Sequence, residues 1–194
     1  MNIDSIKTEV NKRLTDKRRI HTMGVVDTAV KLAKIYGENE DKAKLASLCH
    51  DIFRGVPTEE LNELVKKYNL GNRYLDNANL AHGKLAAKYI QDEFGITDGD
   101  IINAVSFHTT GRANMSLLEK IVFIADAIEP GRNYPQVDEI RDMAVKDIDK
   151  ACLLSLKGTV DHLISSGYSK DSIDIDTLEA IDYFINKEKC IDDK

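Results

Sequence analysis

Residues 44–55 have the sequence KLASLCHDIFRG, and this stretch decides the fold. Apolar residues spaced as on one helix face lead to the adjacent pair His50 and Asp51, and Gly55 then favours a turn. Successive side chains on a helix point about 100° apart. The pair can therefore reach two neighbouring metal ions, or one ion from two sides, and the two oxygens of Asp51 make it the natural bridge.

Helical periodicity continues through the rest of the chain. Apolar residues recur at i, i+3, i+4 and i+7 over 25–36, 101–105 and 117–128, and no alternating run is long enough to predict a sheet. Ser116 has Glu119 three residues later, which is the spacing of a capping box at a helix start. We therefore predict an all-α protein of about nine or ten helices joined by short loops.

The composition is that of an ordinary globular protein. The chain has 194 residues, of which 42% are hydrophobic and 31% are charged, enough for one compact domain. Since no repeat or linker divides it, we expect a single domain over 1–194, with a metal-binding core at about 15–132 and additional C-terminal helices at about 136–190. The net charge of −6 argues against nucleic acid as the main partner, because backbone binding requires a surplus of Lys and Arg.

The cysteines and the N-terminus indicate the compartment. Cys49, Cys152 and Cys190 are odd in number and lack C-x-x-C spacing, which is typical of a reduced intracellular chain. The N-terminus has no apolar run of signal-peptide length, and no stretch approaches the roughly 20 apolar residues that a membrane span needs. We expect a cytoplasmic protein with no membrane partner. The oligomeric state stays open, a homodimer included.

Histidines and aspartates on different helices form a candidate metal site, as in helical folds that build such sites in their core. Any one of these histidines alone is more often a capping or core residue, but their joint order along successive helices favours metal binding. Asp126 adds to this, because a carboxylate inside an apolar helical stripe is costly to bury unless it is paired or metal-bound. The candidate ligands are His21, His50, Asp51, His82, His108 and Asp126.

Residues close to these ligands along the chain are candidates for binding a phosphate-bearing substrate. A guanidinium is planar and matches the oxygens of a phosphate, although the alternative for each arginine is a solvated surface charge. A hydroxyl beside His108 can donate a hydrogen bond. The substrate-binding candidates are Arg18, Arg54, Thr109 and Arg132.

These motifs, in this order, resemble the HD-domain superfamily of metal-dependent phosphohydrolases. More narrowly, the chain resembles the YqeK family of symmetrical bis(5'-nucleosyl)-tetraphosphatases. The resemblance runs from about residue 15 to 155. The HTxG and ADxIEPxR stretches are specific, whereas the His-Asp pair alone is not. The matching segments are RRIHTMGV (18–25), CHD (49–51), AHG (81–83), HTTG (108–111) and IADAIEPGR (124–132).

The resemblance implies an HD-domain helical bundle and an enzyme that cuts diadenosine tetraphosphate symmetrically into two ADP with metal-activated water. It implies two metal ions, divalent or mixed-valent, and it favours iron. Imidazole and carboxylate ligands alone leave manganese, cobalt, nickel and zinc open as well. Where many HD-domain sequences have Lys three residues after the Asp, this chain has Arg54, which keeps the positive charge.

The resemblance also assigns the ligands to two sites that share Asp51. His50 and Asp51 are then the expected catalytic centre. The first site would contain His21, His50, Asp51 and Asp126, and the second would add His82 and His108.

Three other functions remain compatible with the residues. One is an HD-type nucleotidase or phosphodiesterase acting on mononucleotides or cyclic nucleotides, which product analysis would distinguish. Another is a di-iron oxygenase on the same helical frame, which would need oxygen and a non-phosphorylated substrate. The third is a non-catalytic nucleotide-sensing module with a purely structural metal site.

Overall fold

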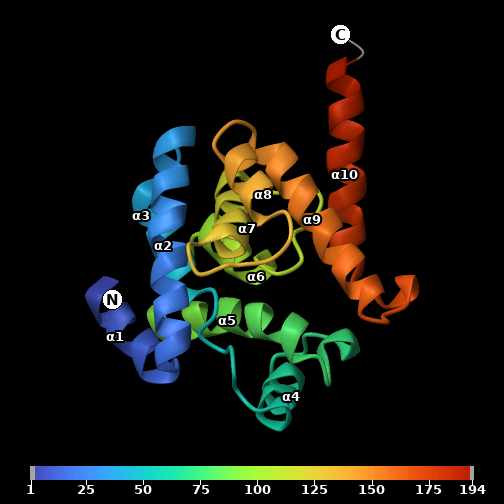
Figure 1. Ribbon diagram of the computed structural model, residues 1–194. Coiled ribbons are helices and arrows are strands. Elements are labelled where there is room, and N and C mark those ends of the chain that lie inside the picture. Colours follow the sequence, from blue (N-terminus) through green and yellow to red (C-terminus); the bar gives the residue numbers. More distant parts are fainter. Residues whose placement is uncertain (1–2, 193–194) are drawn as a thin grey trace.

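The computed structural model describes residues 3–192, and within this range it is helical without any strand. The prediction of an all-α protein is therefore confirmed. Figure 1 shows the helices as a bundle from which the C-terminal helix projects. The elements are α1 (Ile3–Arg13), α2 (Asp16–Tyr36), α3 (Glu40–Cys49), α4 (Thr58–Lys67), the 3-10 helix η1 (Asn72–Tyr74), α5 (Ala78–Phe94), α6 (Gly99–Phe107), α7 (Leu117–Ile128), α8 (Val137–Ala144), α9 (Ile148–Ser165), the 3-10 helix η2 (Lys170–Ser172) and α10 (Ile175–Asp192).

Helix α7 lies at the centre of the bundle. It packs against α2, α3, α6, α8 and α9, and Figure 1 shows it between α2 and α9. Its apolar residues are buried on nearly all sides, as expected for a helix without a solvated face. Ser116 accepts a hydrogen bond from the backbone N–H of Glu119, and the Glu119 side chain accepts one from the backbone of Ser116. This capping box, which the sequence predicted, fixes where α7 begins.

Helices α2 and α3 form an antiparallel pair. Gly37 ends α2 in the left-handed conformation, with φ of 73°, and Asn39 caps α3 by accepting from Lys42 N. The tight connection turns α3 back along α2. The C-terminal end of α3, where His50 lies, therefore returns to the part of α2 that contains His21.

The sequence pattern predicts that His21 and His82 stand at the starts of their helices, but both helices begin earlier. His21 does not open its helix, because Thr15 caps α2 and accepts from Arg18 N. His82 likewise lies one turn inside α5, which starts at Ala78. Arg18 and His21 therefore share one face of a helix that has already formed.

The C-terminal helices pack on the bundle through α9, which contacts α7, α8 and α10. Thr177 on α10 donates a hydrogen bond to the carbonyl of Thr110, at 3.1 Å, and so connects α10 to the loop after α6. Cys49, Cys152 and Cys190 are free, and burial raises the pKa of the Cys49 thiol to about 12. Over the described residues, no helix combines the length and apolar character that crossing a membrane requires.

Candidate metal centre

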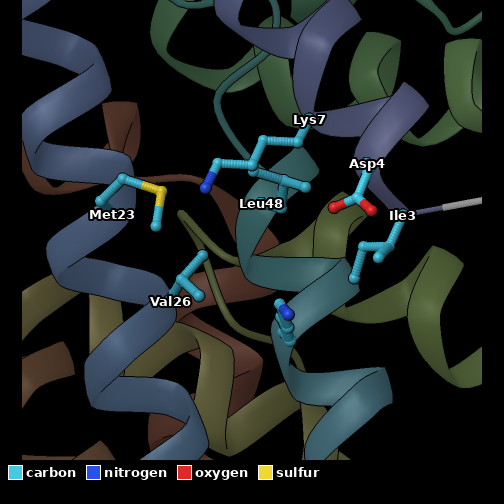
Figure 2. A pocket seen from close by; sticks show the side chains of 7 residues that line it. Ile3, Asp4, Lys7, Met23, Val26 and Leu48 are labelled. Carbon is cyan, nitrogen blue, oxygen red and sulfur yellow. The ribbon is translucent and has the colours of Figure 1, made fainter.

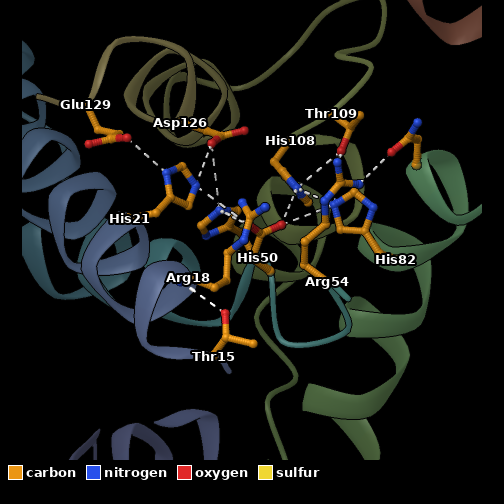
Figure 3. Close-up of polar contacts among 12 residues, drawn as sticks. Thr15, Arg18, His21, His50, Arg54, His82, His108, Thr109, Asp126 and Glu129 are labelled. Atoms are coloured by element: carbon orange, nitrogen blue, oxygen red, sulfur yellow. Dashed lines mark hydrogen bonds and ion pairs between the residues drawn. The ribbon is translucent and has the colours of Figure 1, made fainter. Parts of the chain in front are cut away.

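The structure brings all six predicted ligands together where α2, α3, α5, α6 and α7 meet. Figure 3 shows the side chains of the five labelled ligands turned toward one another, namely His21, His50, His82, His108 and Asp126. His50, Asp51, His82 and His108 are each at most 3% exposed. These residues come from five different helices or helix ends, as the sequence predicted: His21 from α2, His50 and Asp51 from the end of α3, His82 from α5, His108 from the end of α6, and Asp126 from α7.

The carboxylate of Asp51 lies between two pairs of histidines. Its Oδ2 is 3.6 Å from His21 Nε2 and 3.4 Å from His50 Nε2. Its Oδ1 is 3.2 Å from His82 Nε2 and 3.7 Å from His108 Nε2. One oxygen therefore faces each pair, which is the arrangement that a carboxylate bridging two cations requires.

Asp126 completes the half of the cluster that contains His21 and His50. Its Oδ1 lies 3.0 Å from His21 Nε2 and 3.9 Å from His50 Nε2. Ligand atoms of these three residues fall within 4.8 Å of one another, as do those of His50, Asp51 and His108. Both groupings match the dimensions of a metal-binding site.

Each of the four histidines has its Nδ1 held by an acceptor. The partners are backbone carbonyls for His50 (Ser47 O, 2.6 Å), His82 (Ala78 O, 3.1 Å) and His108 (Val105 O, 2.8 Å), and the Glu129 carboxylate for His21 (3.0 Å). Carbonyls and carboxylates only accept hydrogen bonds, so the proton lies on Nδ1 in every ring. In the neutral rings the Nε2 lone pairs then point into the cluster, as in metal-binding histidines.

The charges in the cluster shift the pKa values of its members. Burial raises the pKa of Asp51, but the surrounding imidazoles, His50 first among them, outweigh burial and hold the pKa well below its usual value. Burial lowers the pKa of His50, yet Asp51 and Asp126 outweigh this and the pKa is raised. For His108 burial dominates and the pKa is lowered. The Asp51 carboxylate is therefore ionised near neutral pH.

Two of the nitrogen atoms that face the cluster lack a hydrogen-bond partner among the described residues, and a bound metal would supply it. His21 Nε2 and His50 Nε2 are buried and have no hydrogen-bond partner among the described residues. His82 Nε2 and His108 Nε2 face each other at 3.0 Å, which would oppose two lone pairs if both rings are neutral. Cations between these nitrogens and the two carboxylates would satisfy all of them, and imidazole with carboxylate suits transition metals.

Two of the predicted substrate-binding arginines lie directly at the carboxylates. Arg18 Nη1 is 2.7 Å from Asp51 Oδ2. Arg132 donates from Nη2 to Asp126 Oδ1 and from Nε to the backbone carbonyl of Asp126, the latter at 2.8 Å. Both side chains remain about one-third exposed, so their guanidinium groups border the cluster on its solvent side.

The other two candidates lie on the His82 half of the cluster. The Thr109 hydroxyl is 3.2 Å from His108 Nε2 and 3.4 Å from His82 Nε2. Arg54 makes no ion pair with a ligand and instead donates to Asn79 Oδ1 at 2.7 Å. Since Asn79 lies one turn before His82 on α5, Arg54 stays beside the cluster without contacting its carboxylates.

Sequence reasoning did not single out Glu129, although its carboxylate contacts His21. It lies three residues after Asp126, at the end of α7, and it is 5% exposed. The available signal was a carboxylate at helical spacing from Asp126, followed directly by Pro and Gly.

A separate small cavity lies where α1, α2 and α3 meet, as Figure 2 shows. Its volume is about 60 Å³, whereas pockets for drug-sized ligands have roughly 300–1,000 Å³. It is lined by Ile3, Asp4, Lys7, Met23, Val26, Lys44 and Leu48. None of the candidate ligands borders it, and it is too small for a nucleotide.

Comparison with known proteins places this centre in a family. The family model described as HD domain matches residues 18–131, which include all six candidate ligands. The chain is similar to a crystal structure described as a predicted HD superfamily hydrolase involved in NAD metabolism, from Clostridium acetobutylicum. That structure has a TM-score of 0.90 and 41% identity, over 96% of this chain and 98% of the other.

Several curated relatives have the name bis(5'-nucleosyl)-tetraphosphatase, symmetrical. The relative from Bacillus subtilis (strain 168) is 39% identical over 84% of this chain and 89% of its own length. The relative from Staphylococcus aureus (strain NCTC 8325 / PS 47) is 38% identical over the full length of both chains. The chain therefore belongs to the HD-domain family and, within it, to the group that contains these symmetrical bis(5'-nucleosyl)-tetraphosphatases.

Proposed function

We propose that this chain hydrolyses diadenosine tetraphosphate and related dinucleoside polyphosphates symmetrically into two nucleoside diphosphates. The observation that supports this most directly is Asp51, whose two oxygens each face a pair of buried histidines. Relatives that match most or all of this chain are named for this reaction. Arginines at the open side of the cluster suit a polyphosphate.

The proposal assigns the ligands to two metal ions that share Asp51. When bound, such ions lower the pKa of a coordinated water to about 7 and polarise a phosphoryl oxygen. We propose iron as the resident metal. One ion would be held by His21, His50, Asp51 and Asp126, and the other by His82, His108 and Asp51.

The protein residues bind and orient the substrate for attack by water. Arg18 and Arg132 lie at the carboxylates, so a phosphate that reaches the cluster meets both guanidinium groups and their charges offset its own. Thr109 offers a hydroxyl on the opposite side, and Arg54 borders the same half. Water forms a bond to one of the two central phosphorus atoms, the bridging P–O bond breaks, and the second ADP leaves with that oxygen.

We also propose one domain over the whole chain, acting in the cytoplasm. Residues of about 15–132 would form the metal-binding core, and the helices of about 136–190 would support it. The contact of α9 with α7 and the hydrogen bond from Thr177 to Thr110 are consistent with such support. The three free cysteines suit a reducing compartment.

Incubation with diadenosine tetraphosphate in ¹⁸O-labelled water tests the proposed reaction. We expect ADP as the sole nucleotide product, with one labelled oxygen in the terminal phosphate of half of the ADP molecules. Mass spectrometry of the products measures both. Formation of AMP and ATP would contradict symmetric cleavage, and turnover restricted to mononucleotides would favour a different HD-type hydrolase.

Replacing Arg132 with alanine is expected to weaken substrate binding more than it slows the chemical step. The variant would lose the proposed hydrogen bond between the Arg132 guanidinium and a substrate phosphate. A hydrogen bond between charged groups is worth about 1.5–3 kcal/mol, so kcat/KM should fall about 10- to 100-fold, mainly through KM. Steady-state kinetics on diadenosine tetraphosphate measure this. Lys88→Ala is the matched control, because it removes one positive charge from an exposed position on α5. Equal KM values for both variants and the unmodified protein would remove Arg132 from the site.

A further inference from the structure

Among the four inward-facing histidines, His21 has a different kind of anchor. The Nδ1 atoms of His50, His82 and His108 donate to carbonyls of their own helices, three or four residues earlier. His21 Nδ1 lies 3.0 Å from Glu129 Oε1, a carboxylate that is 108 residues away in the sequence. Figure 3 shows Glu129 and Asp126 on opposite sides of the His21 ring.

The Glu129 carboxylate is buried in a space that glycines keep open. Its Oε2 accepts from the backbone N–H of Gly131 at 2.6 Å. A Cβ added at Gly24 would lie 2.7 Å from Oε2, and one added at Gly131 would lie 3.0 Å from both carboxylate oxygens. Gly24 follows His21 by three residues, so one face of α2 provides both the histidine and the space for its partner.

No lysine or arginine among the described residues forms an ion pair with the Glu129 carboxylate. Arg141 donates a hydrogen bond to the backbone carbonyl of Glu129, at 3.0 Å, and not to its carboxylate. A buried carboxylate is costly without compensation. The Glu129 side chain is only 7% exposed, and the ring that it contacts is that of His21. This contact therefore indicates a role that concerns His21 rather than general stability.

We propose that Glu129 is a positioning residue for His21, a role that rests on the proposed metal-dependent function. By accepting the Nδ1 proton, Glu129 fixes the tautomer and the ring orientation in which His21 Nε2 faces Asp51 and Asp126. Its negative charge also makes Nε2 a stronger electron donor to a metal. Loss of such an outer partner typically costs 10- to 100-fold in metal affinity or activity.

Metal titration of the 194-residue chain with Mn²⁺ tests this role independently of turnover. We expect the Kd to rise roughly 10-fold in Glu129→Gln, which loses the charge, and 10- to 100-fold in Glu129→Ala, which loses the acceptor as well. At saturating metal, the KM for diadenosine tetraphosphate should stay unchanged. Glu119→Gln is the matched control, because it neutralises another buried glutamate of α7 that pairs with Arg112 and not with a histidine.

Gly24→Ala tests the same contact while leaving Glu129 in place. The added methyl group should displace the carboxylate from His21 and raise the Kd for Mn²⁺, although alanine is otherwise favoured in a helix. If Glu129→Ala fails to fold, ¹⁵N-NMR of the imidazoles in the unmodified metal-free protein still shows which nitrogen of His21 carries the proton. A proton on His21 Nε2 instead of Nδ1 would overturn the proposal.

The outcomes separate this inference from the proposed function. Unmodified protein that binds no metal would contradict the proposed function itself. If the unmodified protein binds Mn²⁺ and the Kd is the same in Glu129→Gln and Gly24→Ala, only the role of Glu129 is overturned.

Discussion

Replacing Asp51 with alanine is expected to abolish measurable turnover and to remove the bound metal. Asp51 is 3% exposed, and its two oxygens face all four candidate histidine ligands at 3.2 to 3.7 Å. The variant therefore loses the one group common to both halves of the site. Metal catalysis contributes several kcal/mol to transition-state stabilisation, so kcat should fall on the order of 10³-fold or more, at about 1.4 kcal/mol per factor of ten.

Two further variants separate the bridging role of Asp51 from its charge and from the fold. Asp51→Asn keeps the shape of the side chain but offers a single oxygen, so it should also fail to retain both metals. Asp41→Ala removes a carboxylate from the exposed first turn of α3 and should leave turnover unchanged. Metal analysis of the purified proteins and circular dichroism accompany the kinetics. Full activity in a folded Asp51→Ala variant would show that the assignment of a shared ligand is wrong.

The sequence predicted the six-residue cluster from the order of its histidines and aspartates along successive helices and from the family resemblance, because each histidine alone is more often a capping or core residue. Asp126 lies within an apolar stripe, and a carboxylate there needs a partner in any fold. His50 and Asp51 end an apolar helix, where successive side chains diverge. Figure 3 shows the convergence that this order implies for the ligands that it labels.

The starts of α2 and α5 were less predictable. The first turn of α2 contains Asp16, Lys17 and Arg18, which add nothing to an apolar stripe. Thr15 and Asn77 provide the capping oxygens. Because caps use residue types that are equally common in loops, a cap in front of a polar turn has little predictive weight.

The partners of Glu129 and Arg54 depend on tertiary structure. The contact of Glu129 with His21 exists because α2 crosses α7 with Gly24 facing the end of α7. Arg54 was expected to reach phosphate from its position three residues after Asp51, but its observed hydrogen bond is to Asn79 on α5. Spacing along the chain could not predict either contact, since each joins two segments that are distant in the sequence.

Removing the metal with a chelator is expected to abolish hydrolysis and to lower the melting temperature by about 10 °C. His21 Nε2 and His50 Nε2 are buried without a hydrogen-bond partner among the described residues, so metal binding should stabilise the folded state strongly. At a free metal concentration 1,000 times the Kd, a ligand stabilises by about 4 kcal/mol. For a chain of this length, each kcal/mol corresponds to roughly 2–4 °C.

Reconstitution of the stripped protein then identifies the metal and tests the site together. Anaerobic addition of Fe²⁺, Mn²⁺, Co²⁺, Ni²⁺ or Zn²⁺ should restore both turnover and melting temperature, with Fe²⁺ giving the highest kcat. Asp51→Ala should show neither recovery, because its shared ligand is missing. His162→Ala should show both, since His162 is exposed on α9 and contacts none of the ligands. Undiminished turnover in stripped protein would exclude a metal-activated water, whereas thermal recovery without turnover would mean that the site binds metal for structure alone.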